Sequence, residues 1–202
     1  MAVDGAVPGL SRVGAVHGLV LAAGAGRRMG TPKALVRDVD GTSWLRRAVG
    51  VLRAAGCEPV TVVLGAAAED ALPLLEGTGA TAVVAADWDR GMSASLRAGL
   101  LAAEVSGADA VVVTLVDLPD VGVDVIGRVL ADRPTPATLR RAAYAGRPGH
   151  PVVLGRDHWA GVLEETEGDR GARGYLAIHD VVLVECGDLA SGADVDTRPG
   201  PA

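Results

Sequence analysis

Short runs of β-branched and other hydrophobic residues alternate along the chain with longer segments in which hydrophobic positions recur at helical spacing. This alternation is typical of βαβ units wound into a mostly parallel sheet. Strands are predicted over residues 16–22, 60–64, 81–85, 110–116 and 181–185. Helices are predicted between an N-cap at Thr42 or Ser43 and a stop at Gly56, over 66–75, from an N-cap at Ser93, and over 157–165 and 170–179.

One region departs from the parallel pattern. Residues 139–144 and 150–154 read as strands on either side of a turn at 146–149, which predicts a small antiparallel excursion. The pattern therefore predicts a single-domain, Rossmann-like α/β fold with a mostly parallel sheet flanked by helices. We expect residues 16–197 to form this domain, with flexible segments at 1–15 and 198–202.

The composition agrees with this fold class. The 202 residues are 49% hydrophobic but only 2% aromatic, without a single phenylalanine, so the core must be built from valine, leucine and alanine. This is the composition expected of buried parallel strands and of helices that pack through small residues. The length suits one substantial core.

Charge and cysteine content exclude several classes of protein. The chain has 25 acidic against 19 basic residues, so a general affinity for nucleic acid is not expected. No apolar run is long enough to span a bilayer. Cys57 and Cys186 lie far apart, which predicts reduced thiols in a cytoplasmic protein.

A glycine-rich loop follows the first predicted strand and concentrates basic residues. It reads LAAGAGRRMGTPK from Leu21 to Lys33. Small residues allow a ligand to approach the backbone N–H groups, and Arg27, Arg28 and Lys33 add positive charge. This combination favours a nucleoside triphosphate.

Two further features are expected at the same edge of the sheet, where open α/β sheets bind their ligands. Asp117 leaves the predicted central strand and offers a carboxylate that Mg²⁺ prefers. The helix that begins near Gly91 offers Ser93, Ser95 and free N–H groups toward the same cleft.

Each feature alone has an ordinary structural explanation, namely a tight loop, a turn before Pro119 or a helix cap. The spacing of the loop residues does not match either of two familiar nucleotide-binding motifs. Gly24, Gly26 and Gly30 are spaced one residue longer than in the dinucleotide fingerprint, and Lys33 follows Pro32 and precedes alanine, unlike the P-loop lysine. A dehydrogenase and a Walker-type ATPase are therefore disfavoured.

Six ordered segments resemble the nucleotidyltransferase superfamily and, within it, the molybdenum cofactor cytidylyltransferases. They are LAAGAGRRMGTPKAL, GMSASLRAGL, VDLPDV, RPGHPVVL, GDRGAR and DVDT, in this order, and the match runs from about residue 16 to residue 197. Guanylyltransferase relatives tend to carry Gly-Gly where this chain has Ala22-Ala23-Gly24, so the resemblance favours CTP over GTP. Two positions depart from the family pattern, Leu118 in place of glutamine and Gly26 in place of serine.

The resemblance implies a Mg²⁺-dependent transfer of a nucleoside monophosphate, with Arg28, Lys33 and Asp117 in catalytic roles. It implies Asp117 and Asp196 as metal ligands, and His150, Asp169 and Arg173 on the acceptor side. The implied nucleotide-binding residues are Leu21, Ala22, Ala23, Gly24, Ala25, Gly26, Arg27, Arg28, Lys33, Gly91, Met92, Ser93, Ser95 and Leu96. The implied acceptor is molybdopterin, with a molybdenum hydroxylase as a downstream client.

Three alternatives remain open at this point. Two are enzymes, a molybdopterin guanylyltransferase and a nucleotidylyltransferase acting on a sugar or alcohol phosphate. The third is a carrier or assembly factor for a molybdenum enzyme, which would hold the cofactor without catalysis. Retention of two phosphate-binding cations opposite a metal carboxylate favours catalysis over a pure binder.

Overall fold

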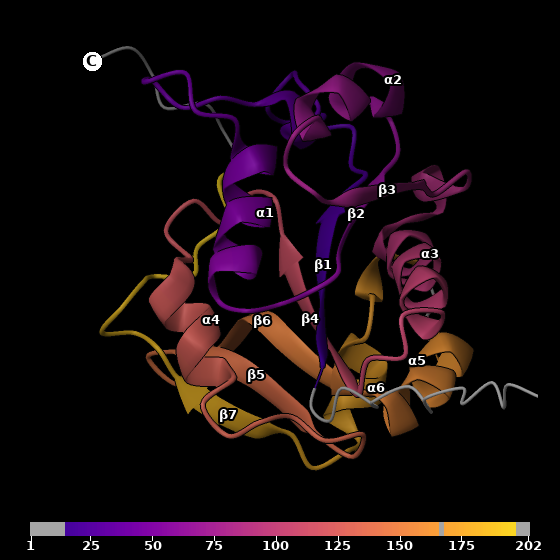
Figure 1. Cartoon of the computed structure of the whole chain (residues 1–202), viewed down its shortest axis with the longest axis vertical. Helices are drawn as coiled ribbons and strands as arrows, with labels where there is room; N and C mark the ends of the chain where they lie inside the picture. The colour runs from indigo at the N-terminus through magenta and orange to yellow at the C-terminus, as the bar shows by residue number, and fades with distance from the viewer. Residues whose placement is uncertain (1–14, 166–167, 197–202) are drawn as a thin grey trace, which may run out of the picture.

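A computed structural model describes residues 15–165 and 168–196, and within them one mixed sheet forms the centre of the molecule. Its seven strands lie in the order β3-β2-β1-β4-β6-β5-β7 (Figure 1). The strands are β1 (Val16–Ala22), β2 (Val60–Leu64), β3 (Thr81–Val84), β4 (Ala110–Leu115), β5 (Leu139–Tyr144), β6 (Arg147–Gly155) and β7 (Val182–Glu185). The predicted α/β fold is confirmed.

One strand runs against the others. β1 pairs in parallel with β2 and β4, and β2 with β3. β6 is antiparallel to both β4 and β5, and β7 is parallel to β5. The predicted antiparallel excursion is therefore β6, which lies between β4 and β5 in the sheet. β5 and β7 run in the same direction as β4.

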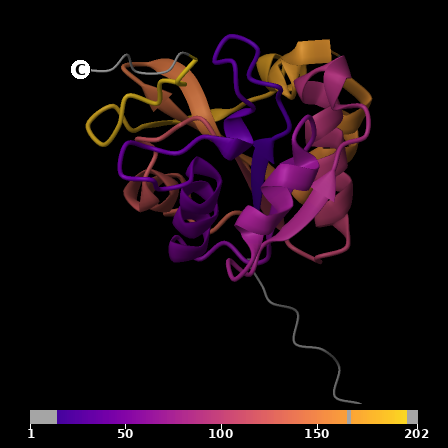
Figure 2. The ribbon, with the colours of Figure 1, turned by 90° about the horizontal axis from the view of Figure 1, so that it is seen from above.

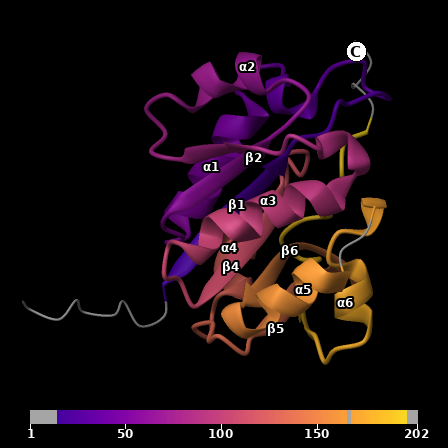
Figure 3. The same cartoon turned by 90° about the vertical axis from the view of Figure 1, so that its right-hand side faces the viewer.

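Helices cover both faces of the sheet. They are α1 (Trp44–Ala54), α2 (Ala68–Ala71), α3 (Met92–Glu104), α4 (Val123–Val129), α5 (Trp159–Glu165) and α6 (Arg173–Ala177). α1 and α4 lie on one face, and α3, α5 and α6 lie on the other, as Figures 1 and 3 show from two sides. The view from above in Figure 2 shows the sheet edge-on between these layers.

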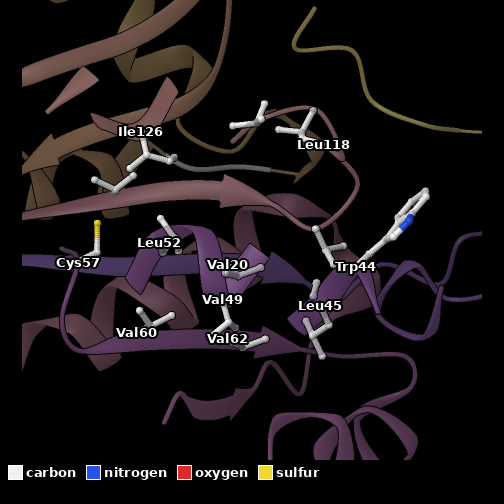
Figure 4. Packing of buried hydrophobic residues seen from close by; sticks show 14 of the residues in the cluster. Val20, Trp44, Leu45, Val49, Leu52, Cys57, Val60, Val62, Leu118 and Ile126 are labelled. Atoms are coloured by element: carbon white, nitrogen blue, oxygen red, sulfur yellow. The ribbon is translucent and has the colours of Figure 1, made fainter. Parts of the chain in front are cut away.

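Each face has its own hydrophobic core, because successive side chains of a strand point to opposite sides. Val20 of β1 packs under α1 with Leu45, Val49 and Leu52 (Figure 4). Leu19, its neighbour in sequence, packs on the opposite face under α3 with Leu100. As the composition indicated, aliphatic and alanine side chains dominate both cores.

The boundaries of the first half follow the predictions closely. β1 and β2 occupy the predicted residues, and the side chain of Ser43 accepts a hydrogen bond from Arg46 N at the start of α1. The chain leaves α1 through Gly56, whose φ of 85° suits glycine. Local sequence patterns determine these elements.

Several expected elements are shorter or different. The helix expected over 66–75 is α2 followed by a 3-10 turn (Leu72–Leu75), because Pro73 cannot continue an α-helix. The helices expected over 157–165 and 170–179 are confined to α5 and α6, each preceded by a 3-10 turn (Arg156–His158 and Gly168–Arg170). α4 was not predicted.

The start of α3 also differs from the prediction. Gly91, not Ser93, is the N-cap residue, and no side chain caps this helix. Ser93 is buried inside the first turn, where its Oγ accepts a hydrogen bond from Gly171 N at 3.2 Å. Leu96 and Leu100 of this helix are buried, whereas Leu101 is 49% exposed.

No helix among the described residues is long and apolar enough to cross a membrane. The flexible segments expected at 1–15 and 198–202 lie outside the described residues, apart from residue 15.

Candidate functional site

The glycine-rich loop and Asp117 leave the same edge of the sheet. β1 and β4 are parallel neighbours whose last paired residues are Leu21 and Leu115. The loop continues directly from β1, and Asp117 follows β4 by two residues. Parallel pairing therefore brings together two segments that are far apart in the chain, as the sequence predicted.

The loop has a conformation that requires glycine at Gly26. This residue has a φ of 60°, and a Cβ atom built on it would lie 1.9 Å from the carbonyl oxygen of Thr31. Its own carbonyl oxygen accepts a hydrogen bond from Met29 N at 2.9 Å. The chain turns back tightly here and delivers Lys33 to the first position of a 3-10 turn (Lys33–Leu35).

Lys33 bridges two carboxylates at the sheet edge. Its Nζ donates to Oδ2 of Asp117 at 2.5 Å and to Oδ1 of Asp196 at 2.7 Å. Nη1 of Arg28 donates to the other oxygen of Asp196 at 3.0 Å. The Arg28 side chain is 81% exposed, whereas that of Lys33 is 19% exposed. The two cations and two carboxylates thus form one connected network.

The network favours the charged forms of Lys33 and Asp196. Burial alone would lower the pKa of Lys33, but hydrogen bonds to Asp117 and Asp196 and their negative charges outweigh it and raise this pKa. The hydrogen bond from Lys33 and its charge, aided by Arg28, hold the pKa of Asp196 below its usual value. Lys33 and Asp196 therefore each stabilise the charged form of the other.

A third carboxylate joins this group. Carboxylate oxygens of Asp117, Asp194 and Asp196 lie within 4.8 Å of one another. Val195 N donates to the backbone oxygen of Asp117 at 3.1 Å, which ties the last described segment to the end of β4. Oxygen donors of this kind suit Mg²⁺ or Mn²⁺. In this structure Lys33 contacts two of the three carboxylates, those of Asp117 and Asp196.

A cavity of about 490 Å³ opens beside this network. Its size is within the range of small-molecule sites. It is lined by Leu21, Ala22, Ala23, Gly24, Ala25, Gly26, Arg27, Arg28, Met29, Lys33, Trp88, Asp89, Gly91, Met92, Ser95, Leu115, Val116, Asp117, Asp169 and Asp196. We call it the loop cavity. Most of the residues expected at the nucleotide line it.

A second cavity, of about 270 Å³, adjoins the first and shares Leu21, Met92 and Leu115 with it. We call it the hairpin cavity, because β5 and β6 supply part of its wall. Its other lining residues are Leu96, Val113, Leu118, Arg141, Gly149, His150, Val152, Leu154, Arg170, Gly171, Ala172, Arg173, Leu176, Gly192 and Asp194.

The two cavities separate the residues expected at the site. His150 and Arg173, expected on the acceptor side, both line the hairpin cavity. Asp169 was expected with them but lines the loop cavity instead. Leu96, expected at the nucleotide, lines the hairpin cavity, and Ser93 lines neither cavity because it is buried against Gly171.

Sequence reasoning missed several residues of the site, among them Trp88, Arg141 and Asp194. Trp88 is half-buried and lines the loop cavity, where it packs against Gly65. Arg141 lines the hairpin cavity, and Asp194 belongs to the carboxylate group. The rarity of aromatic residues could have marked Trp88, whereas Arg141 carries no local signal because its position depends on the β5–β6 pairing.

The cysteines lie away from this site. Both are unpaired and buried, and burial raises the pKa of Cys57 to about 12, so its thiol stays protonated. His17 is also buried and bonds Thr61 Oγ1 through Nε2 at 2.9 Å. These residues have structural roles.

Residues 18–183 match the sequence profile of the MobA-like NTP transferase domain. The match spans most of the chain, including both cavities except for their last aspartates and Gly192. The chain belongs to this family. The family assignment agrees with the fold and with the resemblance found in the motifs.

Two relatives of this MobA-like protein are named for different reactions. The nicotine blue oxidoreductase of Paenarthrobacter nicotinovorans is 36% identical over 192 residues, which cover 90% of this chain and 92% of the relative. A probable molybdenum cofactor guanylyltransferase of Opitutus terrae is 39% identical over 105 residues, covering 52% of this chain and 49% of the relative.

Solved structures agree with the MobA-like fold. Rv0371c of Mycobacterium tuberculosis H37Rv is 30% identical, with a TM-score of 0.74 over 91% of this chain and 93% of that one. The same protein was also solved in complex with manganese, with 29% identity and a TM-score of 0.72 over 90% of this chain and 94% of that one. A nucleotidyl transferase from Methanothermobacter, 24% identical, shares the fold with a TM-score of 0.77 over 91% of this chain and 92% of that one.

Proposed function

We propose that this protein transfers a nucleoside monophosphate, CMP from CTP in preference to others, to a phosphate group of molybdopterin and releases pyrophosphate. The observation that carries the proposal is the network of Lys33 and Arg28 with Asp117 and Asp196 beside the loop cavity. Phosphoryl and nucleotidyl transfer need cations for the phosphates and carboxylates for a divalent metal. This site has both within contact distance.

The chemistry of the donor set fits a divalent cation. Asp117, Asp196 and the neighbouring Asp194 would hold Mg²⁺, which would neutralise charge on the phosphate oxygens. Manganese in the complex of Rv0371c is consistent with a metal in this family. Lys33 and Arg28, released from these carboxylates, would then bind the triphosphate.

The reaction needs no protein nucleophile. An oxygen of the acceptor phosphate attacks the α-phosphorus, a new P–O bond forms, and the bond to the β-phosphate breaks with its electron pair on pyrophosphate. Lys33 and Arg28 stabilise the charge that develops, and the backbone of the exposed Gly24 and the half-buried Gly26 orients the phosphates. Positioning and charge neutralisation account for the acceleration.

The base preference is supported by the resemblance of the loop. Ala22 and Ala23 stand where guanylyltransferases tend to have glycine, and both side chains are buried at the end of β1. This favours CTP. The Opitutus relative named as a guanylyltransferase favours GTP instead, so GTP is the first competitor in the assay.

The acceptor would occupy the hairpin cavity, which opens beside the loop cavity. Molybdopterin is supported by the motif resemblance and by the cofactor named for the Opitutus relative. A molybdenum hydroxylase would then receive the product. Sugar and alcohol phosphates remain the alternative acceptors.

A different function is favoured by one observation, the similarity to nicotine blue oxidoreductase over most of both chains. In that case the loop cavity would bind the electron donor and the hairpin cavity a flat heteroaromatic substrate. The loop spacing differs from the dinucleotide fingerprint, and an oxidoreductase has no need for the bridge between Lys33 and the two aspartates. We therefore place this function second.

Pyrophosphate release tests the proposal. CTP, GTP, ATP and UTP are each incubated with Mg²⁺ and with molybdopterin, glycerol 3-phosphate or no acceptor. The proposal predicts release that depends on both CTP and molybdopterin. Absence of release with every pair contradicts it and favours a carrier.

The competing redox function has its own assay. Nicotine blue is mixed with the protein and a reduced nicotinamide nucleotide, and its colour is followed. Bleaching without pyrophosphate release in the first assay would replace nucleotidyl transfer by reduction.

A further inference from the structure

We propose that Arg141 and Arg173 form a receptor for a phosphate group in the hairpin cavity, and that this receptor binds phosphorylated ligands with an apolar body without a metal ion. The identification of this ligand with the acceptor rests on the function proposed above. The receptor itself rests on the charges and contacts of the cavity.

The guanidinium groups of these two residues lack acidic partners. Within residues 15–165 and 168–196, neither Arg141 nor Arg173 forms an ion pair. Arg141 is half-buried and donates Nε and Nη2 to the carbonyl oxygen of Gly149 at 3.2 and 3.1 Å. These two bonds fix the orientation of the guanidinium.

The positive charges in this cavity act on each other. Burial and the charge of Arg173 lower the pKa of Arg141. Burial, followed by the charges of Arg141 and Arg173, lowers the pKa of His150 to about 4, so His150 is neutral at pH 7. Like charges that repel across a cavity are relieved when an anion binds between them.

Other charged groups also line the cavity. Arg170 adds a third guanidinium, and Asp194 is the acidic residue of the lining. A carboxylate oxygen of Asp194 lies within 4.8 Å of those of Asp117 and Asp196, so Asp194 belongs to the group that would hold the proposed metal. The arginine side of the cavity therefore has a surplus of positive charge.

The loop cavity shows the opposite arrangement. Lys33 and Arg28 are both matched by carboxylates there, so a triphosphate gains these cations only after a metal ion has taken their partners. In the hairpin cavity no such exchange is needed. Binding of a phosphate there should not depend on a divalent metal.

The remaining lining selects the rest of the ligand. Leu96, Val113, Val152 and Leu154 supply an apolar wall on strands and a helix of the core. A cavity of about 270 Å³ accommodates a small ring or a short chain better than a free phosphate ion alone. The geometry points to a phosphate monoester carried on an apolar or aromatic body.

The cavities adjoin at Leu21, Met92 and Leu115. A phosphate held by the two arginines in the hairpin cavity is presented toward the loop cavity, where its oxygen attacks the α-phosphorus. Bidentate guanidinium contacts restrict its orientation. Arg141 and Arg173 thus determine which acceptors are positioned for transfer.

Phenyl phosphate is the probe, and its affinity is measured by isothermal titration calorimetry in EDTA. The proposal predicts binding by the wild-type protein, and much weaker binding of phenol and of inorganic phosphate. Arg141→Gln and Arg173→Gln should each weaken phenyl phosphate binding about tenfold or more, because each removes charge-assisted hydrogen bonds. Arg147→Gln, at the exposed start of β6, is the matched control and should leave the affinity unchanged.

Two variants distinguish a loss of phosphate binding from a loss of folding. Arg173 is exposed at the first residue of α6, so its replacement should not disturb the fold. Arg141→Lys keeps the charge and should retain more affinity than Arg141→Gln. Equal affinity in wild type, Arg141→Gln and Arg173→Gln, or phenol binding as tight as phenyl phosphate, overturns the receptor.

The outcome is separable from that of the proposed function. Arginine-dependent binding of phenyl phosphate without pyrophosphate release in any assay keeps the receptor and rejects nucleotidyl transfer. Pyrophosphate release with an unchanged KM for the acceptor in both arginine variants keeps nucleotidyl transfer and rejects the receptor. If both hold, the arginine variants raise the KM for the acceptor and leave that for CTP unchanged.

Discussion

The ammonium group of Lys33 lies 2.5 Å from Oδ2 of Asp117, although 84 positions separate the two residues in the chain. The contact arises because β1 and β4 are parallel neighbours and both residues follow the carboxyl ends of these strands. Asp196 contacts the same ammonium group from the last described segment. The proposed phosphate-binding cation and the proposed metal ligands therefore neutralise each other before any substrate binds.

Removal of the Lys33 charge should strengthen metal binding. Lys33→Met frees Asp117 and Asp196 from a competing cation. We therefore expect Mn²⁺ to bind about tenfold more tightly in the absence of nucleotide, which corresponds to a binding free energy that is more favourable by about 1.4 kcal/mol. Electron paramagnetic resonance of free Mn²⁺ measures this. The same variant should lose use of the triphosphate, and weaker Mn²⁺ binding would contradict the competition.

Loss of the Asp117 carboxylate should lower the rate of the metal-dependent reaction. Asp117→Asn removes a buried oxygen donor with nearly unchanged shape, so pyrophosphate release should fall at least about 100-fold. Circular dichroism should show an intact fold. Asp124→Asn, an exposed aspartate in the first turn of α4, is the control and should retain full activity. Unaltered turnover in Asp117→Asn would rule out its metal role.

Trp88 should report occupation of the loop cavity. Trp44 and Trp159 are buried elsewhere, at 5% and 2% exposure, whereas Trp88 is half-buried in the cavity lining. Addition of CTP and Mg²⁺ should change the intrinsic fluorescence. Trp88→Leu should abolish most of this change, and a full change in that variant would place the nucleotide elsewhere.

The loop should tolerate alanine at one glycine but not at another. Gly26→Ala places a Cβ at 1.9 Å from Thr31 O and forces a φ of 60° on alanine, so the free energy of unfolding should fall by about 2 kcal/mol or more. A Cβ at Gly24 meets no atom within 4 Å, so Gly24→Ala should change the free energy of unfolding by less than about 0.5 kcal/mol. Urea denaturation at pH 7 compares the two variants. Equal stability of Gly26→Ala and Gly24→Ala would contradict the tight turn at Gly26.

Stability should rise with pH across the range in which His17 titrates. Burial lowers the pKa of His17 from 6.5 to about 4, so between these values the unfolded chain binds a proton that the folded protein does not. Unfolding is therefore favoured as pH falls through this window, by about 2 to 3 kcal/mol for this residue. Urea denaturation at pH 4.5 and 7 measures the difference. The pKa of His150 is lowered over the same range, so His17→Gln should lose about half of the pH dependence that the two histidines produce. An unchanged pH dependence of stability in this variant would contradict the role of His17.

The sequence predicted those features that depend on local patterns or on the parallel sheet alone. β1, β2 and α1 follow from hydrophobic runs and from Ser43 and Gly56 as boundary residues. The proximity of the loop and Asp117 followed from the rule that parallel strands place their carboxyl ends at one edge.

What the sequence did not predict depends on tertiary contacts. Ser93 reads as a helix cap, but Gly91 takes that position and the turn that contains Gly171 packs against the Ser93 hydroxyl. Arg141 reads as an exposed strand residue, and only the pairing of β5 with β6 places it in a cavity. α4 is short and lacks a side-chain cap, so its sequence carried no boundary signal.

The reversal of β6 also divides the work between two halves of the chain. Most of the loop cavity comes from residues before 120, whereas the arginines of the hairpin cavity come from residues after 139. Evolution can therefore remodel the second half and change what is modified without disturbing how the activated donor is held. Under the proposed function, such a modular arrangement would allow one scaffold to serve different acceptors.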